Sequence, residues 1–106
     1  MLGDVARAEG DLPAARKAYE DCLAIAKALS DRDPGNTQWK RDLSVSYERL
    51  GDLLEQQNDI LAAANGYEQS LPIAEALAAK DKTNATFQSD VEITRRRLAE
   101  LRAQLP

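Results

Sequence analysis

Side chains able to carry out acid–base, nucleophilic or metal chemistry are scarce in this sequence. Its 106 residues include one cysteine, Cys22, and no histidine. Metal sites and disulfides need more such groups than that. No glycine-rich loop of the kind that cradles phosphate is present. We therefore predict no enzyme activity, no cofactor and no metal site. We interpret Cys22 as a small residue packed against a neighbouring helix, with a reactive thiol as the alternative.

The charge balance bears on possible partners. Lys and Arg number 14 and Asp and Glu number 18, which gives a net charge of −4. Such a chain has no overall attraction to nucleic acid or to an anionic membrane. The basic run Arg95-Arg96-Arg97 lies on a predicted helix, where consecutive side chains point ~100° apart and form no single patch. No stretch reaches the ~18 apolar residues of a membrane span, and the start lacks a signal-peptide pattern. We expect a cytoplasmic protein.

The spacing of apolar residues predicts an all-α chain. Apolar positions recur every three or four residues in about five segments, which we expect to be antiparallel helices: 1–9, 12–32, 38–57, 60–80 and 85–104. Asp11 is a good helix N-cap, and Asn36 or Thr37 is expected to cap the third helix. Pro72 lies well inside the fourth segment, where a kink is expected. Trp39 is interpreted as a core residue rather than as a platform for a ligand.

The sequence resembles itself with a 48-residue period, so that Leu2-Gly3-Asp4 matches Leu50-Gly51-Asp52. The further pairs are Ala15 with Ala63, Tyr19 with Tyr67, Leu29 with Leu77, Asn36 with Asn84, and Trp39 with Phe87. Such a period is typical of stacked helical hairpins that bury their apolar faces against one another. We predict a single domain, within a larger protein, that has a partial first unit (1–32), a complete unit (36–81) and a C-terminal capping helix (84–105).

Some of the repeated residues carry a family resemblance. They are Leu50-Gly51, Ala63, Tyr67 and Ser70 in one unit, and Leu2-Gly3, Ala15, Tyr19 and Cys22 in the other. This pattern resembles the tetratricopeptide repeat, whose usual period is about 34 residues. The chain looks like a long-helix variant with a 48-residue period. The resemblance implies hairpins stacked as an α-solenoid, and a protein–protein interaction scaffold that binds a partner protein or peptide.

The same resemblance implies a binding face. In tetratricopeptide arrays the first helices of the units line a concave groove that holds peptides. The matching positions here are Asp4, Arg7, Ala8, Val45, Glu48, Asp52, Glu55, Gln56, Ile93, Arg96, Glu100 and Gln104. One subfamily clamps acidic tails with Lys and Asn, but Glu48 and Asp52 take those places here. We therefore expect a groove that prefers a peptide of basic or mixed charge, with an ordinary solvated face as the alternative.

The last predicted helix leaves two functions open. Its apolar residues step by four and three and form one narrow seam: Phe87, Val91, Thr94, Leu98, Leu101 and Leu105. Such a helix can cap a stack. It can also dimerise as a coiled coil. The alternative to a scaffold is therefore a homodimer, formed through this helix or through the N-terminal edge where the first unit is incomplete.

Overall fold

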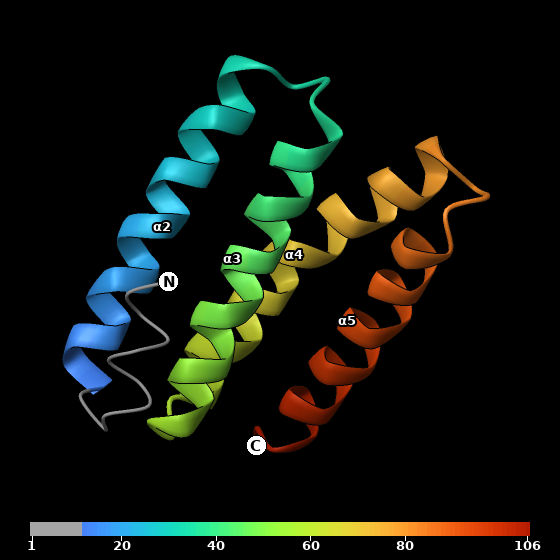
Figure 1. The fold of residues 1–106 in the computed structure, drawn as a ribbon. Coiled ribbons are helices and arrows are strands. Elements are labelled where there is room, and N and C mark those ends of the chain that lie inside the picture. Colours follow the sequence, from blue (N-terminus) through green and yellow to red (C-terminus); the bar gives the residue numbers. More distant parts are fainter. Residues whose placement is uncertain (1–11) are drawn as a thin grey trace.

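The computed structural model describes residues 12–106, which form four helices and no strand (Figure 1). Their bounds are α2 Leu12–Arg32, α3 Thr37–Gln56, α4 Ile60–Lys80 and α5 Ala85–Ala103. The prediction of an all-α chain is confirmed for this range, and the predicted helix over residues 1–9 lies outside it. None of the described helices combines the length and the apolar character that crossing a membrane requires.

Side-chain caps explain where three of these helices begin. Asn36 accepts a hydrogen bond from the backbone N of Trp39 at 3.0 Å, and Asn84 accepts one from Phe87 at 3.1 Å. Asp59 caps α4 in the same way through the backbone N of Ala62 at 3.2 Å. Each cap satisfies a backbone N–H that has no partner within its own helix.

The 48-residue period reappears in the helix bounds. Helix α4 begins and ends one period after α2, and the caps Asn36 and Asn84 have the same separation. Tyr19 and Tyr67 are both buried, with 1% and 4% of their surface exposed. Residues that match in sequence therefore occupy matching positions in two helix pairs, α2 with α3 and α4 with α5, which we call the first and second hairpins.

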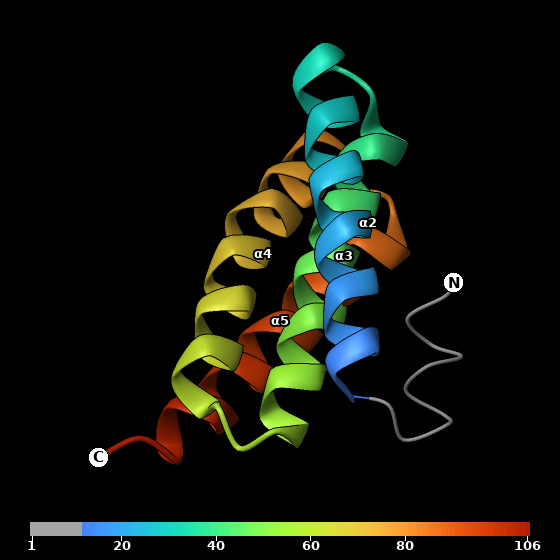
Figure 2. The ribbon, with the colours of Figure 1, turned by 90° about the vertical axis from the view of Figure 1, so that its left-hand side faces the viewer.

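Each helix packs against the helix that precedes it in the chain. Helix α3 contacts α2 and α4, and α5 contacts α4. Figures 1 and 2 show α4 to one side of α2 and α3, with α5 alongside α4. No Cα atoms of α3 and α5 approach within 8 Å of each other, so side chains alone bridge these two helices. The largest apolar cluster fills the space among α3, α4 and α5: Leu54, Ala63, Ala64, Tyr67, Leu98 and Leu101.

Helices α3 and α4 approach each other closely at Gly51. A Cβ atom on Gly51 would lie 3.1 Å from the Tyr67 ring and 3.2 Å from the carbonyl oxygen of Ala63. Gly66, on the facing helix, is tighter still, because its Cβ would lie 3.0 Å from the carbonyl oxygen of Tyr47. No prediction from the sequence concerned Gly66. The two glycines together let the helix backbones come close.

Pro72 does not end α4, which remains helical from Ile60 to Lys80. The predicted kink stays a prediction.

Candidate functional site

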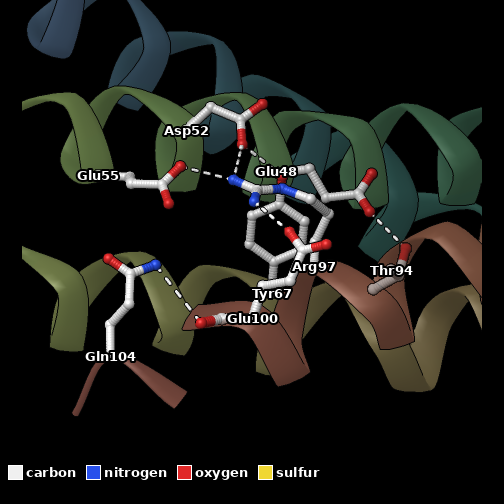
Figure 3. Close-up of polar contacts among 8 residues, drawn as sticks. All are labelled: Glu48, Asp52, Glu55, Tyr67, Thr94, Arg97, Glu100 and Gln104. Carbon is white, nitrogen blue, oxygen red and sulfur yellow. Dashed lines mark hydrogen bonds and ion pairs between the residues drawn. The ribbon is translucent and has the colours of Figure 1, made fainter. Parts of the chain in front are cut away.

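Three acidic side chains of α3 lie on the side of the helix that faces α5. Glu48, Asp52 and Glu55 are spaced by four and three residues, which places them on one helical face. Figure 3 shows them directed toward side chains of α4 and α5. We call the whole group the α3–α5 bridge; it comprises Glu48, Asp52, Glu55, Tyr67, Thr94, Arg97 and Glu100.

Arg97 is the central cation of the α3–α5 bridge. Its Nη2 atom lies 2.5 Å from Oε1 of Glu55 and 3.7 Å from Oδ1 of Asp52, and its Nη1 lies 2.8 Å from Oε2 of Glu100. The Arg97 side chain is only 28% exposed. Its hydrogen bonds, that to Glu100 above all, raise the pKa of Arg97 above the ordinary arginine value. One guanidinium thus joins carboxylates on two helices.

Tyr67 of α4 adds the third helix to the bridge. Its hydroxyl donates a hydrogen bond to Oδ1 of Asp52, and its ring lies beneath Arg97 (Figure 3). Burial, and then the hydrogen bond to Asp52, raise the pKa of Tyr67. The phenol therefore stays protonated and acts as a hydrogen-bond donor at neutral pH.

Glu48 joins the α3–α5 bridge through Thr94 of α5. The hydroxyl of Thr94, which is buried, donates a hydrogen bond to Oε1 of Glu48 at 2.5 Å. Burial is the main cause that raises the pKa of Glu48, and the Thr94 hydrogen bond partly opposes it. Beyond the bridge, toward the start of α3, Nε of Arg41 lies 3.0 Å from Oδ2 of Asp90. These contacts fix the rotation of α5 about its axis relative to α3.

The predicted binding residues fall into three groups. Glu48, Asp52, Glu55 and Glu100 come together in the α3–α5 bridge. Gln56 and Arg96 are exposed. Asp4 and Arg7 lie outside the described residues.

Arg97 was not among the predicted binding residues, whereas its neighbour Arg96 was. The signal that could have identified Arg97 was the narrow apolar seam of α5. Arg97 comes three residues after Thr94 and four before Leu101, both of which belong to that seam. That spacing places Arg97 on the helix face that turns toward α3.

The carboxylates of the bridge are already paired within the molecule. A basic peptide on this face would have to compete with Arg97, and that competition lowers the gain in free energy from binding. Within residues 12–106, no cluster of His, Cys, Asp or Glu side chains is arranged to hold a metal ion. The arrangement joins three helices, and its hydrogen-bonded groups have an evident structural role.

A second candidate surface is a groove of about 250 Å³ between α2 and α3. Its lining is mostly apolar and consists of Cys22, Ile25, Ala26, Leu29, Trp39, Asp42 and Ser46, which together define the α2/α3 groove. Ile25 is 62% exposed and lies beside other apolar side chains of this groove. Cys22, predicted to be packed against a helix, is half-buried and lines this groove. Trp39 is also only partly buried.

A third hollow, of about 280 Å³, lies between the start of α3 and the second half of α4. Its walls include Pro34, Thr37, Pro72, Ile73 and Lys80. Lys40 and Lys80 both line this hollow, and the structure places no acidic side chain among its lining residues. It is a less developed candidate, because nothing around it indicates the chemistry of an occupant.

Comparisons of the chain with protein-family models, with curated proteins and with solved structures found no match.

Proposed function

We propose that this chain is a protein–protein interaction scaffold of the tetratricopeptide type, in which 48-residue hairpins stack as an α-solenoid and recruit a partner protein. The observation that carries the proposal is the α2/α3 groove. It presents the side chains of Ile25, Leu29 and Trp39 along a polar rim that contains Asp42 and Ser46. Exposed apolar side chains with a polar border are typical of surfaces that bind other proteins.

The α3–α5 bridge supports this function indirectly. Its ion pairs hold α5 against α3 and α4, so they stabilise the frame on which the groove is built. Catalysis is not part of the proposal, because the convergent groups of the bridge are engaged in helix–helix contacts.

The proposal is tested by photo-crosslinking from the groove in the organism's own extract. A photoreactive amino acid replaces Ile25 in one variant and Leu61, a 70% exposed residue of α4, in a control variant. We expect a discrete crosslinked protein from position 25 and none from position 61. The purified partner should then bind the wild-type chain saturably and bind Ile25→Glu much more weakly, with Leu61→Glu unaffected. Absence of any saturable partner would contradict the proposal.

Self-association is the second candidate function. The observation that favours it is Ile93, which is 44% exposed on α5, a helix whose backbone comes close to that of α4 but not to those of α2 and α3. Two copies stacked head to tail would cover both Ile93 and the α2/α3 groove. Light scattering over a range of concentrations separates the candidates: a monomer favours recruitment of a different protein. A dimer that is lost in both Ile25→Glu and Ile93→Glu favours self-association.

A further inference from the structure

The second hairpin provides a template for what covers the first. Three of the polar contacts that join α3 to the pair α4 and α5 define this template. Ser44 and Ser70 share a hydrogen bond of 2.7 Å between their hydroxyl oxygens. Arg41 pairs with Asp90 at 3.0 Å, and Thr94 donates to Glu48 at 2.5 Å. On α3, the contact residues 41, 44 and 48 occupy one helical face.

The three residues that α3 contacts in this way each have a counterpart 48 residues earlier in the sequence, and all three counterparts line the α2/α3 groove. Ser70, Asp90 and Thr94 correspond to Cys22, Asp42 and Ser46, which line it. The apolar residues Ile73 and Leu77 correspond to Ile25 and Leu29 in the same way. The α2/α3 groove of the first hairpin is therefore the same kind of surface as the one that the second hairpin presents to α3.

Burial differs between the two surfaces as expected if the first one lacks its covering helix. Ser70 and Thr94 are fully buried, whereas their counterparts Cys22 and Ser46 are only partly buried. Leu77 is buried and Leu29 is partly exposed. Asp42 is exposed and accepts a hydrogen bond from Gln38 of its own helix at 2.8 Å, whereas Asp90 is paired with a cation from another helix.

Within residues 12–106, only side chains of α2 and α3 line the groove, so no other described helix covers it. A covering helix in the register of the template would present residues at the places that Arg41, Ser44 and Glu48 take in the template. A second copy fits less well. Its α5 would present Ser89, Glu92 and Arg96 at these places, with no cation opposite Asp42 and a carboxylate against Cys22.

We propose that the α2/α3 groove binds an amphipathic helix of a partner protein that carries a basic residue, a small residue three positions later and a carboxylate seven positions later. The basic side chain pairs with Asp42, the small residue lies against Cys22, and the carboxylate accepts a hydrogen bond from Ser46. Apolar residues on the same face cover Ile25 and Leu29. This inference rests on the proposed scaffold function and specifies the chemistry of the partner.

The probe is a synthetic peptide with the sequence of residues 37–58 in which the position of Trp39 is phenylalanine. Trp39 of the intact protein is then the only tryptophan in solution, because the chain contains one. We expect a saturable change in Trp39 fluorescence as the peptide is added. We also expect Cys22 to react several-fold more slowly with a thiol reagent, because the bound helix covers it.

A charge exchange tests the register. Replacing the arginine of the peptide that corresponds to Arg41 with glutamate should weaken binding at least tenfold, and so should Asp42→Arg in the protein with the original peptide. Combining the two changes should restore most of the affinity. Asp31→Arg, at an exposed position near the end of α2 and outside the groove lining, is the matched control and should leave binding unchanged.

Each outcome has a defined meaning. Equal affinity of the peptide for the wild-type protein and for Asp42→Arg overturns the inference. A peptide that displaced the chain's own α3 would behave in this way. A peptide that does not bind while a natural partner still crosslinks to position 25 also overturns it and leaves the proposed function standing. Loss of both the peptide and the crosslinked partner removes the function as well. A dimer that the peptide disrupts would identify a second copy as the occupant, which contradicts the inference.

Discussion

The guanidinium of Arg97 lies over the ring of Tyr67, with the Cζ atom 5.7 Å from the ring centroid. The hydroxyl of the same ring donates to Asp52, which also lies near Arg97. Cation and phenol therefore share one acceptor on α3 while they come from α5 and α4. The contact between these two side chains is the point at which three helices meet.

Removing Arg97 should destabilise the fold, whereas removing Arg96 should not. We expect Arg97→Gln to lower the free energy of unfolding by about 1–2 kcal/mol, because it removes partly buried ion pairs and a cation–π contact. The exposed neighbour Arg96 provides a matched control in Arg96→Gln, which should change stability by less than about 0.5 kcal/mol. Urea denaturation followed by circular dichroism measures both. Equal losses in the two variants would show that the bridge contributes nothing specific.

A methyl group at Gly66 should force α3 and α4 apart. The Cβ of Gly66→Ala would lie 3.0 Å from a backbone oxygen, which cannot move without moving the whole helix. We expect a net loss of about 1–2 kcal/mol, since overpacking outweighs the better helix propensity of alanine. Gly35→Ala is the control, because its nearest neighbour would lie 3.8 Å away. Thermal unfolding should show a lower midpoint for Gly66→Ala only, and an unchanged midpoint would refute the close approach.

Neutralising Glu48 should stabilise the protein at neutral pH. Burial raises the pKa of Glu48, so the folded state binds the proton more tightly than the unfolded state, and the ionised form opposes folding. Glu48→Gln keeps the acceptor for Thr94 without the charge, and we expect a gain of no more than about 1 kcal/mol above the folded pKa. The gain should shrink as the pH falls through that pKa. It should vanish below the ordinary value of about 4.3, where the wild-type side chain is also neutral. Stability of both forms measured from pH 3.5 to 8 checks the sign; a gain that grows toward acid would contradict it.

Ser30→Ala should also stabilise the protein. The hydroxyl of Ser30 is buried and has no hydrogen-bond partner among the described residues. An unsatisfied buried hydroxyl is costly, and alanine favours helix, so we expect a gain of about 1 kcal/mol. The 48-residue period supplies independent support, because the counterpart of Ser30 is the buried Ala78. Calorimetry should show a higher unfolding midpoint. A lower midpoint would mean that the hydroxyl has a favourable partner.

The helices themselves could be predicted from sequence because local signals agree with one another. Helices α2 and α4 match the predicted bounds, α3 begins and ends one residue earlier than predicted, and α5 ends one residue earlier. Asn36 and Asn84 mark the starts of two helices by chemistry that needs no tertiary information, since a cap acts within one turn. Repetition of the pattern after one period then established which helices are equivalent.

The partners of the acidic residues could not be predicted with the same accuracy. Arg96 and Arg97 are neighbours in sequence, yet only Arg97 faces Asp52 and Glu55. Choosing between them requires the rotation of α5 about its axis to within ~100°, and packing on another helix sets that rotation. Gly66 was missed for a related reason, because its role depends on a backbone oxygen of the facing helix.

Backbone contacts are confined to successive helices, and this bears on how such a chain can change in length. The backbone of α3 comes close to those of α2 and α4 and meets α5 through side chains alone, so an additional 48-residue segment inserted after α3 would meet surfaces equivalent to those already present on either side. Tandem duplication of a coding segment of this size would thus add a hairpin and leave each existing interface with an equivalent neighbour. Growth by whole hairpins is compatible with this architecture, whereas an insertion of a few residues within a helix would turn every later side chain to a different face.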